Sequence, residues 1–167
     1  EDLAGAEDRH LRLRGEHQAV ARAGVDPHLY QASAGDVTRM AAANAVFYNG
    51  LHLEGKMSDI LAKMGRNKPV VALGESVDPA RLLDPPDAPG QHDPHIWLDP
   101  VLVRDILLPR IVDFLAELAP SEASAMQDRA NLLADSLTVL DQEIRDLLLA
   151  SEGLNLGMAF MRGALNY

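Results

Sequence analysis

The chain has 167 residues, 47% of them hydrophobic and 24% charged, with a formal net charge of −10 at pH 7. This length fits one domain, or one domain and part of another, with a real hydrophobic core. The acidic balance argues against nucleic acid as a partner, because phosphate binding needs clustered Lys and Arg. It either favours cationic ligands or only keeps the surface soluble.

Two absences narrow the possible chemistry further. The chain has no cysteine, which removes disulfides, thiolate zinc sites and thiol catalysis. No apolar run reaches the roughly 18 residues of a membrane-spanning helix, so we expect no membrane span. A signal peptide is not visible in a sequence that begins at Glu1. Any metal would have to be held by His, Asp and Glu.

Helices and strands are predicted to alternate in the first half of the chain. Residues 10–14 alternate in polarity and predict a short edge strand, and residues 24–35 form a loop. Asp36 is the expected cap of a helix over 37–44. Short apolar runs predict buried strands at 45–48 and 69–73, separated by a helix over 53–64 with Gly65 as its C-terminal cap. This order predicts a parallel sheet covered by helices, the α/β class.

The second half is predicted to be mostly helical. Residues 74–91 form a long Pro- and Gly-rich loop, of the kind that is usually functional or mobile. Asp99 and Pro100 have the form of a helix start, and the helix over 101–118 should kink or divide at Pro109. Residues 121–150 carry apolar side chains spaced four and three apart, over about 45 Å of helix. Such a stripe is typical of a coiled-coil seam, and the alternative is a strut between two lobes.

The tripeptide Asp-Pro-His occurs twice, ending at His28 and at His95, which lies in the segment HDPHIWLDP of residues 92–100. Neutral imidazole is a common ligand of divalent transition metals, and two on separate loops can hold one ion. Asp26 and Asp93 can accept a hydrogen bond from the ring nitrogen that faces away from the metal. Either histidine alone would be assigned to the surface, but the repeat predicts that the fold brings them together.

The remaining polar candidates have simpler explanations. His92 and His52 are expected at the surface, and His10 and His17 lie in the undetermined start. Trp97 is predicted to be a core anchor that fixes His95, while Asp99 is a helix cap. Glu54 and Glu75 are possible outer partners of the histidines. No phosphate loop, nucleophile elbow or His-Glu-x-x-His helix is present, so nothing supports an enzyme.

Three motifs together resemble a known family: GVDPHLY at 24–30, VFYNGLHLEG at 46–55 and HDPHIWLDP at 92–100. In order and spacing they are similar to the zinc/manganese-type solute-binding proteins of bacterial metal-uptake ABC transporters. The resemblance implies two α/β lobes joined by a rigid helix, with metal in the cleft between them. It also implies an extracytoplasmic location, periplasmic or as a cell-surface lipoprotein, and an ABC permease as partner.

By this resemblance His28 and His95 match the two metal ligands of the N-terminal lobe, for Zn²⁺ or Mn²⁺ and with no organic cofactor. The two ligands of the C-terminal lobe have no match, and Ala159-Phe160 is only an echo of one of their motifs. We therefore expect a lobe at 1–120 whose first strand and helix are missing or degraded, a connecting helix at 121–150, and the start of another lobe at 151–167.

Such a chain would be an incomplete member of the family, as an isolated fragment or the product of a disrupted gene. Two histidines leave coordination positions to water or a partner, which predicts weak metal binding. The uncovered stripe on 121–150 predicts self-association. The alternatives are a helical interaction module and a nonfunctional remnant, both with incidental histidines. The loop at 74–91 lacks the His-rich tract common in zinc-specific members, so the metal remains open between the two.

Overall fold

The computed structural model describes residues 25–85 and 90–151. The edge strand predicted at 10–14 and the segment 153–167 lie outside these ranges. The α-helices are α1 (Ala34–Ala42), α2 (Ser58–Met64), α3 (Pro100–Leu102), α4 (Leu108–Leu118) and α5 (Ala123–Ser151), and the strands are β1 (Val46–Tyr48) and β2 (Val70–Ala72). None of the described helices is long and apolar enough to span a bilayer.

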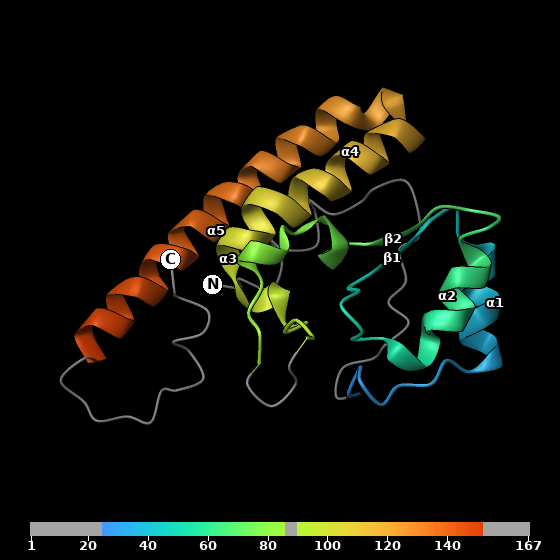
Figure 1. The fold of residues 1–167 in the computed structure, drawn as a ribbon. Helices are drawn as coiled ribbons and strands as arrows, with labels where there is room; N and C mark the ends of the chain where they lie inside the picture. The colour runs from blue at the N-terminus through green and yellow to red at the C-terminus, as the bar shows by residue number, and fades with distance from the viewer. Residues whose placement is uncertain (1–24, 86–89, 152–167) are drawn as a thin grey trace, which may run out of the picture.

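The two strands form the predicted parallel pair. Val46 lies opposite Val70, and Tyr48 lies opposite Ala72. The connection between them contains α2, as a parallel crossover requires. In Figure 1, α1 and α2 lie together on one side of the strands, and α4 and α5 lie on the other. The α/β class with helices flanking a parallel sheet is therefore confirmed.

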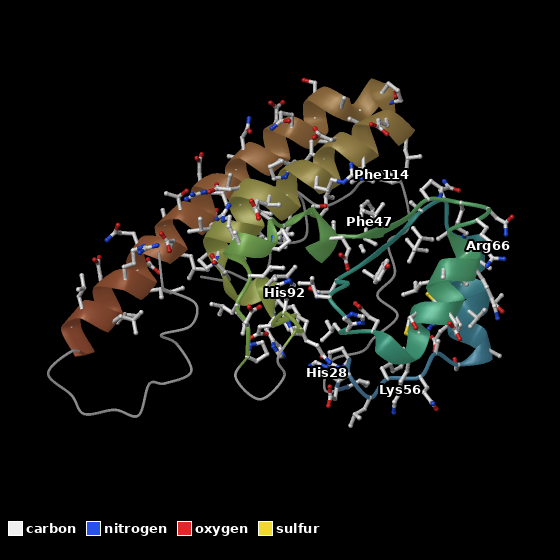
Figure 2. The ribbon with its side chains drawn as sticks, in the orientation of Figure 1. His28, Phe47, Lys56, Arg66, His92 and Phe114 are labelled. Carbon is white, nitrogen blue, oxygen red and sulfur yellow. The ribbon has the colours of Figure 1, made fainter. Side chains whose placement is uncertain are left out.

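Three apolar clusters hold these layers together. One lies under α1 and α2 and contains Met40, Met57 and Leu61. The second joins the loops after both strands to the start of the helical half, and consists of Leu51, Val77, Ile96, Leu102 and Leu107. The third lies between α4 and α5. Phe47 on β1 also meets Phe114 on α4 edge to face, with ring centroids 5.2 Å apart (Figure 2). The sheet is thus tied to both helical layers.

Helix α1 begins earlier than predicted, because the cap is Ser33 and not Asp36. The Ser33 hydroxyl accepts the Asp36 amide, and the Asp36 carboxylate accepts the Ser33 amide, which makes a reciprocal capping box. Asp36 thus lies inside the first helical turn. At the other end of α1, Lys68 donates to three carbonyls, those of Met40, Ala41 and Ala43, and so joins the helix to the start of β2.

The segments around α2 follow the prediction with two changes. The predicted helix over 53–64 starts as a 3₁₀ turn at Gly55–Met57 before α2 proper, and Gly65 follows as its C-terminal cap. The predicted loop at 74–91 contains two 3₁₀ turns, Gly74–Ser76 and Pro79–Arg81, and buries Val77 in the core. This stretch is therefore partly a packed connection.

The helix expected over 101–118 is divided as its proline predicts. Asp99 caps it by accepting the amides of Val101 and Leu102, and Pro100 is the first helical residue. A π-helical turn at Val103–Leu107 separates α3 from α4, and Pro109 follows directly. Proline lacks an amide hydrogen and crowds the preceding turn, so a widened turn before it relieves both problems.

Helix α5 has 29 residues and realises the long helix predicted for 121–150. The first part of its apolar stripe is covered, since Met126 and Ala130 are buried against α4. Further along, Leu140 and Leu147 have exposed fractions of 45% and 71%. Figure 1 shows α5 running past α3 and ending away from the other described helices. The stripe is therefore buried at one end and open at the other.

Candidate metal centre

The first Asp-Pro-His forms a tight turn that the sequence itself determines. The Asp26 carboxylate accepts the backbone amide of His28 at 2.9 Å, and the Leu29 amide donates to the Asp26 carbonyl. An Asp two residues before a free amide favours this turn, and Pro27 restricts the bend between them. His28 is exposed. Its ring is therefore presented outward from a short loop before α1.

The second Asp-Pro-His repeats the bond from the aspartate to the histidine amide and adds a bond to the ring. Its backbone is closed differently, since the Ile96 amide donates to the Pro94 carbonyl at 2.8 Å. The Asp93 carboxylate accepts the backbone amide of His95 at 2.9 Å and also lies 2.5 Å from Nδ1 of its imidazole. With Nδ1 donating to a carboxylate, Nε2 is left as the lone-pair nitrogen. The predicted ring contact is thus seen for Asp93, whereas the described bond from Asp26 goes to the backbone.

The fold brings the two histidines together, as the repeat predicts. Their Nε2 atoms are 3.4 Å apart, and their ring centroids are 5.4 Å apart. Two nitrogens bound to one tetrahedral Zn²⁺ at about 2.0–2.1 Å would lie about 3.3–3.4 Å apart. The pair thus has the spacing of two ligands on one edge of a tetrahedron, and it equally allows a histidine-to-histidine hydrogen bond.

The other candidates fall into different roles. His92 lies beside Asp84, with its Nδ1 2.8 Å from the Asp84 carboxylate, and His52 is exposed. Trp97 is not the core anchor predicted, since its exposed fraction is 45%; its ring does contact His95, with centroids 5.2 Å apart. The buried anchor of this loop is Ile96. The segment forms a 3₁₀ turn at Ile96–Leu98, in which Ile96 is buried and Trp97 is exposed.

Glu54 and Glu75 are possible outer partners of the histidines by sequence, and the described bonds place them elsewhere. The Glu54 carboxylate accepts the amides of Asn49 and Gly50, and Glu75 accepts that of Leu51. Both line a cavity of about 450 Å³ beside α2. Burial, with the charges of Glu75 and Glu54 added, raises the pKa of the Tyr48 phenol at its rim. The two glutamates thus support the turn after β1.

The loop that carries His28 is anchored by the carboxylate of Asp36, the residue that the sequence predicts as a helix cap. The Tyr30 hydroxyl donates to Asp36 at 2.5 Å, and the Ser33 hydroxyl and Arg39 donate to the same carboxylate. The bond from Tyr30 is the main reason that the pKa of Asp36 lies well below its usual range. Tyr30 also packs on the cluster under α1 and α2, which fixes the far end of the loop.

No third metal-binding type of side chain joins the pair in the part of the chain that the structure describes. Within residues 25–85 and 90–151 no group of three or more His, Asp or Glu side chains is arranged to hold a metal ion. His10 and His17 lie outside these ranges. The geometry is therefore that of two imidazoles facing each other across two loops.

Comparisons with known proteins give the setting for this geometry. The chain is similar to the manganese-binding lipoprotein MntA of Bacillus subtilis, with 38% identity over 71% of this chain and 38% of the relative. It is 35% identical to the zinc-binding protein TroA of Treponema pallidum, over 73% of this chain and 39% of TroA. The solved structure of TroA matches with a TM-score of 0.68 and 34% identity, over 74% of this chain and 43% of TroA.

The chain thus spans less than half the length of these relatives. The model of the zinc-uptake complex component A family, periplasmic (ZnuA), matches residues 13–159, which is most of the chain and includes both histidines and α5. This chain belongs to the ZnuA family of periplasmic metal-uptake components.

Proposed function

We propose that the chain captures a divalent transition metal ion, Zn²⁺ or Mn²⁺, outside the cytoplasm for delivery to an ABC permease. The observation that carries this proposal is the 3.4 Å separation of the His28 and His95 Nε2 atoms, which suits two ligands of one ion. The names of the relatives, one manganese-binding and one zinc-binding, support a metal cargo and leave its identity open. Their names as a lipoprotein and a periplasmic protein support the location.

In this proposal residues 1–120 form the N-terminal metal-binding lobe and residues 121–150 the connecting helix. Residues 151–167 would begin the C-terminal lobe, an assignment that lies almost wholly outside the described part. Two imidazoles fill two coordination positions, so water or groups from a partner complete the shell. We therefore expect metal binding by this chain to be weak.

Calorimetric titration with Zn²⁺ and with Mn²⁺ tests the proposal. The unmodified chain should bind one ion weakly, and His28→Ala and His95→Ala should each remove that binding, because a single imidazole holds an ion poorly. His52→Asn is the matched control, since His52 is exposed and asparagine tolerates its positive φ of 64°. Equal binding by all four chains would refute a site made by the pair, and tight 1:1 binding by the monomer would refute a half-site.

A second candidate role is self-association through α5. Leu133, Leu140 and Leu147 lie on one stripe and are exposed, and apolar stripes of this kind promote helix pairing. Light scattering at rising concentration should show dimers that Leu140→Glu or Leu147→Glu dissolves. Leu149→Glu, an exposed leucine off the stripe on the same helix, should leave the dimers intact. A monomer at all concentrations would exclude this role.

A further inference from the structure

The chain leaves β1 through a backbone turn that is unusual for its residues. Gly50, Leu51 and His52 follow one another with positive φ angles of 82°, 51° and 64°. The Leu53 amide donates back to the Gly50 carbonyl at 3.0 Å and closes this left-handed turn. Leucine and histidine rarely adopt this conformation, and they persist in it only where the surroundings hold them. The turn is thus maintained by its neighbours.

Two carboxylates and a glycine supply this support. Three successive amides, those of Asn49, Gly50 and Leu51, donate to Glu54 and Glu75. The Gly74 amide donates to the Asn49 carbonyl at 2.7 Å. A Cβ on Gly74 would lie 2.8 Å from that carbonyl oxygen, so the close approach requires glycine. The backbone of Asn49 is therefore fixed through both its amide and its carbonyl.

The side chain of Asn49 links this fixed backbone to the second Asp-Pro-His by hydrogen bonds. Its amide nitrogen donates to the Pro94 carbonyl at 2.9 Å and to the Gly50 carbonyl at 3.1 Å. The Pro94 carbonyl belongs to the peptide bond that leads into His95. Fixing that peptide plane sets where the His95 side chain leaves the backbone, while Asp93 sets the rotation of its ring.

We propose that Asn49 is a positioning residue for metal capture: from the left-handed turn after β1 it holds the Pro94–His95 peptide, so that the His95 ring already faces His28 before an ion arrives. This inference rests on the proposed function of the histidine pair. Holding a ligand in place before binding avoids the cost of ordering it during binding, and so it raises affinity without any contact to the ion.

Asn49→Asp is the variant that tests this role, because aspartate keeps the shape of asparagine and lacks the amide donor. Asn67→Asp makes the same change in charge at an exposed position before β2. Two readouts are measured on each: the affinity for Zn²⁺, and amide hydrogen exchange of His95 and His28 in the chain without metal. Circular dichroism confirms that each variant is folded.

We expect Asn49→Asp to weaken Zn²⁺ binding about tenfold, at the lower end of the 10–100-fold range for groups that orient a ligand. Exchange of the His95 amide should speed up while that of His28 stays the same. Asn67→Asp should change neither. Equal affinities for the two variants, or equal acceleration at both histidines, would overturn the inference, since a general loss of structure affects both loops.

The outcome also separates this inference from the proposed function. If the unmodified chain binds no Zn²⁺, the proposed function fails and the role in capture fails with it, while exchange still reports whether Asn49 holds the loop. If the unmodified chain binds and Asn49→Asp binds equally well, only the positioning role is wrong.

Discussion

The two Asp-Pro-His loops share a sequence and an aspartate-to-amide hydrogen bond, but their backbones are closed differently and the protein anchors them in different ways. In both, the aspartate accepts the histidine amide at 2.9 Å. The His95 loop is then fixed close to the imidazole, by Asp93 on the ring and Asn49 on the preceding carbonyl. The His28 loop is fixed two residues further on, through the bond from Tyr30 to Asp36.

This difference shows which part of a site a short motif can build. The bond from the histidine amide to the aspartate carboxylate is local, so the tripeptide makes it twice. The orientation of each ring depends on partners distant in sequence, and Asn49 lies 45 residues from Pro94. We infer that the orientation of the His95 ring is fixed in advance and that the His28 ring is the one that reorients. The following predictions test that asymmetry.

The largest effect is expected from Gly74→Ala, which disturbs the close contact between Gly74 and Asn49 that supports the His95 loop. The new Cβ would lie 2.7 Å from Leu51 Cγ and 2.8 Å from the Asn49 carbonyl oxygen. Because a backbone atom is involved, we expect a loss of about 3 kcal/mol in the free energy of unfolding, the upper end for overpacking. Urea unfolding measures it. Gly55→Ala is the control, since nothing lies within 4 Å of its Cβ position; equal losses would contradict the explanation.

A smaller effect should separate the two aspartates. Asp93→Ala and Asp26→Ala each remove the carboxylate that accepts the histidine amide, but only the first removes a bond to an imidazole. Loss of a partner that orients a ligand typically costs at least about tenfold in metal affinity. Calorimetry with Zn²⁺ should therefore show the larger loss for Asp93→Ala. Comparable losses in both variants would mean that the ring bond is unimportant.

The smallest expected effect is a change in stability at low pH, and it concerns the bond from Tyr30 to Asp36 that anchors the His28 loop. The pKa of Asp36 is lowered from its ordinary value of 3.8, chiefly by the bond from Tyr30. The ionised Asp36 carboxylate therefore contributes its full stabilisation above pH 3.8, and this stabilisation declines as the pH falls below that value. Tyr30→Phe removes this bond. The difference in unfolding free energy between the original chain and Tyr30→Phe should shrink as pH falls from about 5 towards 2. A constant difference would assign the effect to packing alone.

Much of this arrangement could be predicted from sequence because it depends on local rules. The strands at Val46–Tyr48 and Val70–Ala72 follow from short apolar runs, the cap at Asp99 from an Asp-Pro pair, and the divided helix from Pro109. The meeting of His28 and His95 followed from a repeated tripeptide.

What sequence reasoning missed depends on tertiary contacts. Nothing in a single sequence shows that Leu51 and His52 adopt positive φ, because the energy that holds them comes from Glu54, Glu75 and the approach of Gly74. The same holds for Asn49: an Asn-Gly pair is typical of a turn, but it does not show that the asparagine side chain reaches the Pro94 carbonyl. Ser33 was overlooked as a cap although Asp36 lies three residues later, the spacing of a capping box.

Helix α5 packs against α4 near its start and ends away from the other described helices (Figure 1). Met126 and Ala130 are buried against α4, and further along the exposed Thr138 accepts a hydrogen bond from Arg104. Beyond Asp141 about ten more residues extend roughly 15 Å at 1.5 Å each. A small tilt of α5 about its packed start therefore displaces Leu147 further than it displaces Met126. The position of Leu147 relative to the two histidines therefore depends on the angle at which α5 packs on α4.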